Sequence, residues 1–140
     1  MIMSLFKVFD IAGSAMSAQN TRLNTTASNL ANAETVSSTE EGAYRARQPV
    51  FAAMMKGLYG TGPESVGVQV RGVVESDAPV QMRYAPDNPM ANEDGYVYQS
   101  NVNMVDEMVN MISASRSYQN NVEVINTSKQ LLLATLRMGE

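Results

Sequence analysis

Three short stretches of this sequence hold residue types that could do chemistry. The stretch YGTGPESVG carries Gly60, Gly62 and Gly67, and glycine-rich loops can cradle phosphate groups with their backbone N–H groups. Such loops need a lysine at a fixed position or open directly into a helix, whereas here Pro63 follows and a strand-like segment comes next. The pattern therefore predicts an ordinary loop.

Neighbouring acidic residues form the second candidate, at Glu40–Glu41, Glu93–Asp94 and Asp106–Glu107. Neighbours in sequence point in different directions, so none of these pairs can share a proton by itself. Acid–base catalysis would also need an apolar pocket that shifts one pKa. We expect solvated charges in turns and at a helix start. The third stretch, DNPMANED, lacks the alternating ligands and the glycine of a calcium loop.

Composition excludes several classes of site. The 140 residues contain no His and no Cys, which excludes disulfides, common zinc sites and Ser-His or Cys-His nucleophile pairs. The formal net charge is −4 and the positive residues are scattered, so no basic patch is available for nucleic acid. We expect a protein that is not an enzyme and that binds no cofactor, metal ion or nucleic acid.

No apolar run approaches the ~20 residues that a membrane-spanning helix needs, so no direct membrane span is expected. The first residues, MIMSLFKVFDIAG, lack the basic segment of a secretory signal, and Lys7 and Asp10 interrupt their apolar run. If the protein leaves the cytoplasm, we expect a route without a cleaved signal peptide.

Two long amphipathic segments are expected to form the framework that positions the functional surfaces of this chain. In the first, from about 4 to 33, large apolar residues recur every seven positions, and smaller residues between them form a second line. The first line is Phe9, Met16, Leu23 and Leu30, and the second is Ala12, Gln19, Thr26 and Ala33. This spacing predicts a helix that pairs with another helix as in a coiled coil.

The second segment runs from about 103 to 137 and repeats the seven-residue spacing. Its first line is Met104, Met111, Tyr118, Ile125 and Leu132, and the expected second line is Met108, Ser115, Val122, Lys129 and Leu136. Asn103 is predicted to cap the helix start, where Asp106 and Glu107 suit the positive end of the helix dipole. At ~1.5 Å per residue, each helix would be roughly 45–50 Å long.

The middle of the chain, about 34–102, contains all five prolines and alternates with a period of two. The stretches YRARQPVF, VGVQVRGVV, PVQMRY and YVY predict strands, and APDNP and NEDG predict turns. The sequence thus predicts an α+β fold, in which the terminal segments 1–36 and 102–140 pair as an inner domain and 37–101 forms a small antiparallel β module. So small a module is expected to leave both helices largely uncovered.

The polar residues of the first helix are almost all uncharged. Between Ala12 and Ala33 the one charged residue is Arg22, and the many Ser, Thr and Asn residues are poor helix formers. Neutral polar groups are far cheaper to bury than charges when each finds a hydrogen-bond partner. We therefore expect this helix to be enclosed by several neighbouring subunits, and both chain ends to gain order only on assembly.

The stretch SAQNTRLNTTASNLANAET resembles the N-terminal signature of the flagellar rod and hook family. Its motif residues are Ser28, Asn29, Leu30, Ala31, Asn32 and Thr35. The stretches GAYRARQPVF, DNPMANEDGYVYQSNVNMVDEM and SNVNMVDEMVNMISASRSYQNNVEVINTSKQLLLATLRMG are similar to one branch of the short proximal-rod proteins in that family. The looser spacing between Thr35 and Tyr44 is typical of this branch, although it blurs the alignment over 36–43.

This resemblance implies a structural subunit of the proximal rod of the bacterial flagellar basal body. Copies would stack helically into a hollow shaft that crosses the periplasm and transmits motor torque. They would travel unfolded through the type III export apparatus, and their partners would be other rod subunits and the base of that apparatus. The expected assembly interface comprises Phe9, Met16, Leu23, Leu30, Met104, Met111, Tyr118, Val122, Ile125 and Leu132.

One alternative remains, a secreted helical protein that acts on membranes or as an effector of a related export system. Helices of that kind carry a basic polar face. Arg22 alone does not supply one in the first helix.

Overall fold

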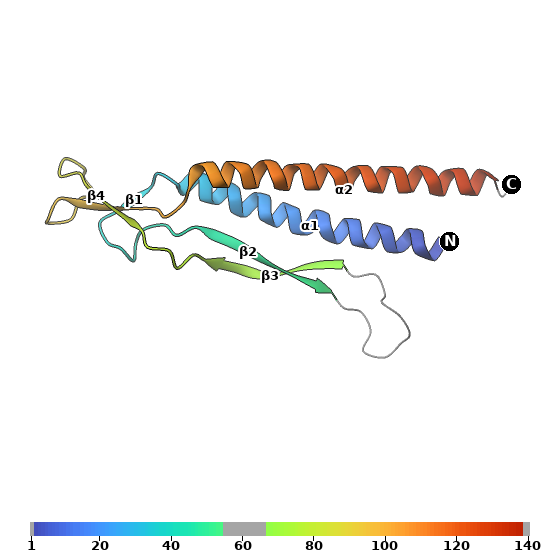
Figure 1. Cartoon of the computed structure of the whole chain (residues 1–140), viewed down its shortest axis with the longest axis horizontal. Coiled ribbons are helices and arrows are strands. Elements are labelled where there is room, and N and C mark those ends of the chain that lie inside the picture. Colours follow the sequence, from blue (N-terminus) through green and yellow to red (C-terminus); the bar gives the residue numbers. More distant parts are fainter. Residues whose placement is uncertain (1, 55–66, 139–140) are drawn as a thin grey trace.

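The computed structural model describes residues 2–54 and 67–138 and shows an elongated molecule (Figure 1). Two long antiparallel helices account for most of its length, the sheet that contains β1 and β4 extends it beyond them, and α1 begins at the end where α2 finishes. The elements in chain order are α1 (Ile2–Asn32), β1 (Val36–Ser37), β2 (Arg47–Met54), β3 (Gly67–Glu75), β4 (Gln81–Tyr84), β5 (Tyr96–Gln99) and α2 (Met104–Met138). The predicted α+β class is confirmed.

The predicted helix boundaries agree with the structure to within two residues. Asn103 caps α2 as expected, because its Oδ1 accepts hydrogen bonds from the backbone N–H groups of Val105 (3.1 Å) and Asp106 (3.4 Å). Asp106 and Glu107 lie in the first turn and Arg137 in the last. The heptad spacing and the cap together locate both long helices.

The two helices pack against each other along most of their length. On α1, the face that packs against α2 is the predicted one. Ala12, Thr26 and Ala33 of its second line are buried, and the large residues of its first line are half-buried. Gln19 of the same line is half-buried, and its side-chain Oε1 atom is buried without a hydrogen-bond partner.

The second line expected on α2 is wrong for three of its five residues, while the other two, Ser115 and Val122, are half-buried. Met108 and Leu136 are 52% and 56% exposed, and Lys129 is also exposed. The residues that lie at this position in the structure are Glu107, Ala114 and Ser128, all buried, and the half-buried Asn121. The small side chains of Ala114 and Ser128 let the two helices approach closely there, which large apolar residues would prevent.

The strands form two separate sheets. β1, β5 and β4 form an antiparallel sheet in that order, and its central strand holds Val97, which is fully buried. The rings of Tyr84 and Tyr96 meet edge to face with centroids 5.2 Å apart. The apolar face expected from PVQMRY is not covered within the chain, since Met82 and Tyr84 are 59% and 64% exposed.

β2 and β3 form a long antiparallel hairpin with an irregularity between Val50 and Phe51. This hairpin lies along α1 on the side away from α2, so the molecule has three tiers (Figure 1). The Val68 N–H donates to Ser14 Oγ at 3.1 Å, near the middle of the helix. The expectation that the central segment would leave the helices largely uncovered is therefore wrong for α1.

The predicted turns between β4 and β5 are confirmed. Asn92 Oδ1 accepts hydrogen bonds from the N–H groups of Asp94 and Tyr96, and Asn88 Oδ1 accepts one from Met90. Gly95 has a φ of 81°, where a side chain would be strained. The amide oxygens of the DNPMANED stretch thus hold a turn. The loop predicted from YGTGPESVG lies outside the described residues, except for Gly67.

Candidate assembly interface

The buried interior of the single chain is unusually small for its apolar content. Among the described residues, the largest fully buried side chains are Val97 and Asn29. The other buried hydrophobic residues are alanines, namely Ala12, Ala18, Ala33, Ala43 and Ala114. The large apolar side chains of both helices are therefore covered only in part, which is unfavourable for a protein that works alone.

Nine of the ten residues expected at the assembly interface are half-buried in the structure. They lie on the helices α1 and α2 of the same chain, and Met104 differs in being 41% exposed. The partial exposure leaves room for contacts with other molecules, but within one chain the same side chains already help to join α1 to α2. Their role between subunits stays a prediction.

The family motif forms a polar clasp that is centred on Asn29, which is 1% exposed. Its Nδ2 donates to the Arg47 carbonyl oxygen at 2.8 Å, and its Oδ1 accepts from the Arg47 N–H at 2.9 Å. The Tyr44 hydroxyl also donates to this Oδ1 at 3.0 Å. Asn29 thus pairs with the first residue of β2 as a neighbouring strand would, and it fixes the hairpin to α1.

The other motif residues complete the junction. Ser28 Oγ lies 3.1 Å from the Tyr44 hydroxyl oxygen, and Asn32 Nδ2 donates to the Ser28 carbonyl oxygen at 2.8 Å. Thr35 Oγ1 donates to the Asn32 carbonyl oxygen, while the Thr35 carbonyl accepts from the Ser100 N–H. Leu30 is half-buried and Ala31 is exposed. The motif thus ends α1 and directs the chain toward β1.

Sequence reasoning missed two partners of the clasp, Tyr44 and Asn101. Asn101 Oδ1 accepts from the Ala46 N–H at 2.7 Å, and its Nδ2 donates to the Ala78 carbonyl oxygen at 2.8 Å. The Arg47 guanidinium carbon lies 5.5 Å from the centroid of the Tyr44 ring, within the range of a cation–π contact. No local spacing rule could have signalled these contacts, because they join distant parts of the chain.

One exposed stripe on α2 is apolar. Val105, Met108, Val109 and Ile112 are 68%, 52%, 61% and 56% exposed, and their spacing of three and four residues places them on one side of the helix. Such a stripe is costly in water and is typical of a surface that another molecule covers.

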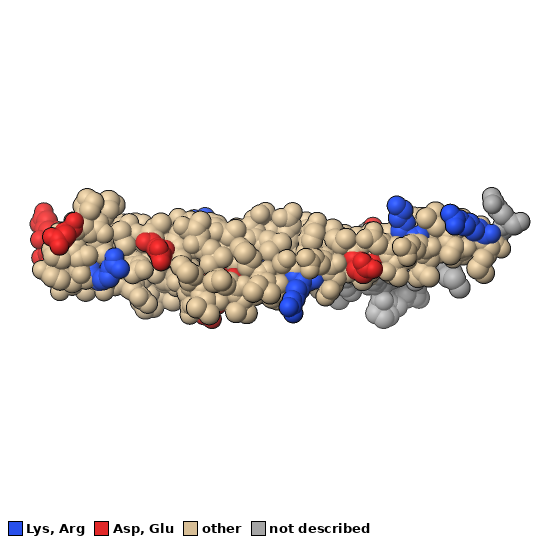
Figure 2. Space-filling view, turned by 90° about the horizontal axis from the view of Figure 1, so that it is seen from above, with Lys and Arg blue, Asp and Glu red and all other residues tan. Residues whose placement is uncertain are grey.

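A different stripe on α1 is exposed and uncharged. From Gly13 to Ala31 the exposed positions recur every three or four residues and hold small or amide side chains. They are Gly13, Ser17, Asn20, Asn24, Ala27 and Ala31. Figure 2, which views the molecule from the α2 side, likewise shows few charged side chains along its length. The neutral surface expected from the sequence therefore exists, although α2 and the hairpin already enclose the rest of α1.

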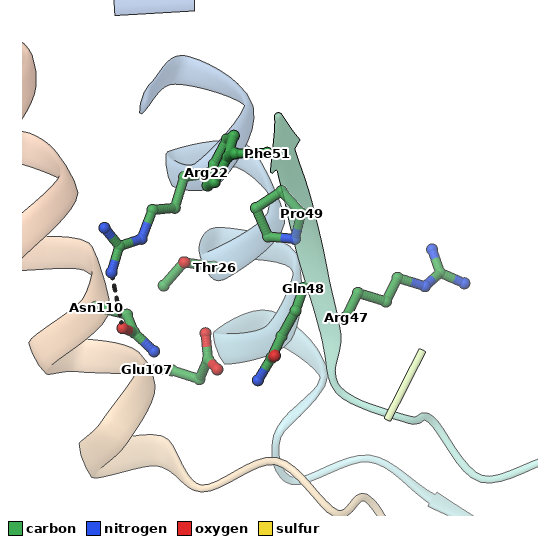
Figure 3. A pocket seen from close by; sticks show the side chains of 8 residues that line it. All are labelled: Arg22, Thr26, Arg47, Gln48, Pro49, Phe51, Glu107 and Asn110. Carbon is green, nitrogen blue, oxygen red and sulfur yellow. Dashed lines mark hydrogen bonds between the residues drawn. The ribbon is translucent and has the colours of Figure 1, made fainter. Parts of the chain in front are cut away.

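A polar cavity of about 260 Å³ lies where α1, α2 and β2 meet (Figure 3). Its lining residues are Arg22, Thr26, Arg47, Gln48, Pro49, Phe51, Glu107 and Asn110. Arg22 donates to Asn110 Oδ1 at 3.0 Å. Glu107 is 7% exposed, so the expectation of a solvated charge at this position is wrong. The reason is that the position faces α1 across the helix pair.

The geometry offers little for catalysis or for metal binding. The cavity holds one carboxylate, and within 2–54 and 67–138 no group of three or more acidic, His or Cys side chains could hold a metal ion. In the same ranges, no helix is both long enough and apolar enough to cross a membrane. What the described residues present are surfaces suited to protein contacts.

Comparison with known proteins decides the family. A family model described as "Flagella basal body rod protein" matches residues 9–36, and one described as "Flagellar basal body rod FlgEFG protein C-terminal" matches residues 93–138. The chain is 51% identical over 138 residues to the flagellar basal-body rod protein FlgC of Salmonella typhimurium, covering 99% of this chain and 100% of the relative. This chain belongs to the FlgC family of flagellar basal-body rod proteins.

More distant members support the same assignment. The FlgC protein of Yersinia enterocolitica is 50% identical over 138 residues, covering 99% of this chain and 100% of that protein. That of Borreliella burgdorferi is 34% identical over 147 residues, covering 96% of this chain and 97% of that protein. The comparisons give no support to the membrane-active or effector-like alternative. The two matched segments hold the family motif, β5 and the whole of α2, and the FlgC relatives match nearly the whole chain.

Proposed function

We propose that this chain is a structural, non-enzymatic subunit of the proximal rod of the flagellar basal body. Many copies would associate helically, together with other rod subunits and the base of the export apparatus, into a hollow shaft that transmits torque across the periplasm. The observation that supports this proposal is the partial burial of large apolar side chains along both helices. A subunit that neighbours enclose needs no large core of its own.

The mechanical role follows from how the three tiers are joined. The Asn29 clasp fixes the hairpin to α1, and the seam of α1 with α2 joins the chain's two ends. Torque on one tier is therefore passed to the others through many modest contacts. We expect the two terminal segments and the central segment, as divided at 36 and 102, to move as one body in the assembled rod.

Deleting the gene in the organism that encodes this chain is expected to abolish swimming, because the shaft would be incomplete. Basal bodies purified from cells that carry the restored, tagged gene should contain the tagged chain. Normal swimming of the deletion strain, or basal bodies that lack the chain while the cells swim, would contradict the proposed function.

We further propose that the chain is exported unfolded and without a cleaved signal peptide, and that its ends become ordered on assembly. The Ser, Thr and Asn residues of α1 support this, since an isolated helix of this composition is weak. Circular dichroism of the dilute chain should show much less helix than α1 and α2 together would give. A full helical signal from a monomer would count against ordering on assembly.

A further inference from the structure

The cavity between α1, α2 and β2 contains a carboxylate that lacks a partner. Glu107 is more than nine-tenths buried, and its side chain makes no hydrogen bond or ion pair with any residue that the structure describes. Figure 3 shows this carboxylate directed into the cavity, on the side of Thr26 and Gln48. The carboxylate oxygens still reach the open cavity, so they are accessible to a hydrogen-bond donor from outside the chain.

The charges around the cavity select the kind of group that would fit. The Arg22 guanidinium lies in the same lining and donates to Asn110, which is one helical turn from Glu107 (Figure 3). A cation in the cavity would be attracted by Glu107 but repelled by Arg22. An anion would be attracted by Arg22 but repelled by Glu107. A neutral carboxamide suits both, because its NH₂ group can donate to Glu107 while its oxygen accepts from Arg22 or Asn110.

The chain itself exposes carboxamides at the same height on the opposite side of α1. Asn20 and Asn24 are exposed, and Asn24 Nδ2 donates to Asn20 Oδ1 at 3.2 Å, which leaves the Asn24 oxygen and the Asn20 NH₂ group directed to solvent. At about 100° per residue, Arg22 lies about 200° around the helix from Asn20, as Thr26 does from Asn24. The cavity and the uncharged stripe therefore occupy opposite sides of one helix.

We propose that the cavity of one copy receives the Asn20–Asn24 pair of a second copy, whose amide donates to Glu107. This inference rests on the proposed function, for which it names a contact between neighbouring subunits. Because the two surfaces differ and face opposite ways, each copy binds one neighbour on each side. A contact of this heterologous kind repeats into a ring or a helix and does not stop at a dimer.

Cysteine cross-linking tests the contact, and the natural chain contains no Cys that would interfere. Ala27→Cys lies on the exposed stripe, one turn from Asn24, and Gln48→Cys lies on the exposed rim of the cavity. In basal bodies from swimming cells, a short thiol-reactive cross-linker should join the double variant Ala27→Cys/Gln48→Cys into a ladder of multimers. Each single variant should stay uncross-linked.

Two outcomes of this experiment would overturn the inference. Dimers formed by either single variant alone would show that like surfaces meet. A double variant that remains monomeric on the gel, although the cells swim and the basal bodies contain it, would show that these surfaces are apart. In that second case the proposed function stands, because the chain is still incorporated.

Substitution of Glu107 tests the chemistry of the site. Glu107→Leu removes the carboxylate that the neighbour's amide would bind, so incorporation into basal bodies should drop roughly tenfold or more while the amount of protein in whole cells stays unchanged. Glu107→Gln keeps the shape of the side chain, and its incorporation into basal bodies should fall several-fold. This variant tests the inference if the leucine variant does not fold. Asp106→Asn, in the same turn but exposed, is the control and should incorporate normally. Unchanged incorporation of both Glu107 variants would overturn the inference.

Discussion

Replacing Ile125 with aspartate is expected to abolish incorporation into basal bodies and swimming, while the protein is still made. Ile125 is half-buried in the first line of α2, which packs along α1. A carboxylate without a partner in this seam costs on the order of 3 kcal/mol, and it also blocks contacts that neighbours would make there. Leu23→Asp, in the corresponding line of α1, should have the same effect. Swimming-zone diameter and immunoblots of whole cells and of purified basal bodies measure the outcome.

The matched controls are Ile125→Val and Leu23→Met, which keep an apolar side chain of similar volume at each position. Both should swim nearly as well as the natural protein. Normal swimming of an aspartate variant would show that the seam is dispensable. Loss of the aspartate proteins from whole cells would instead point to degradation, and incorporation would then be measured for Ile125→Asn.

Asn29→Ala is expected to lower the free energy of unfolding by about 3 kcal/mol, because it leaves the N–H and C=O groups of Arg47 without their partners. The Tyr44 hydroxyl loses its bond to Asn29 at the same time. Because both helices are expected to be ordered in the assembled rod, urea unfolding of the chain within purified basal bodies, followed by limited proteolysis and immunoblotting, measures the change. The effect should be large although the side chain is short, because Asn29 is almost fully buried.

Two further variants measure how much the individual hydrogen bonds of the clasp contribute to the free energy of unfolding. Tyr44→Phe removes one hydroxyl and should cost about 1 kcal/mol. Asn29→Asp keeps an oxygen that accepts from the Arg47 N–H but loses the donor to the Arg47 carbonyl, so its stability should fall between those of Tyr44→Phe and Asn29→Ala. Equal stability of Asn29→Ala and the natural chain would show that the hairpin is held to α1 by other contacts.

The two helices could be predicted from sequence because their signals are local. Seven-residue spacing, the cap at Asn103 and the alternation in β3 each involve residues close together in the chain. The second line of α2 was misplaced because apolar content favoured Met108 and Leu136, whereas the close contact is made at Ala114 and Ser128. Which of two adjacent rows of side chains on a helix faces the partner helix depends on the shape of that partner. The sequence of one helix alone does not determine it.

The candidate site could be predicted only in part, since its contacts join distant residues. Asn29 stood out through the family motif, but its partner Arg47 lies 18 residues further along the chain. The burial of Glu107 follows from the approach of α1, and the coverage of α1 follows from the direction in which the hairpin folds back. Both depend on tertiary packing that neither charge pattern nor propensity reveals.

The contacts that close the helix pair join residues far apart in sequence, as Arg22 and Asn110 do across 88 positions. When an unfolded chain passes through a narrow export channel, these two segments leave the channel at different times, whichever terminus goes first. If the chain is exported unfolded, as proposed, the first of the two helices to leave the channel has no partner until the other has also left it. Closing so long a loop would then be the last step of folding, and the helix pair would form outside the channel.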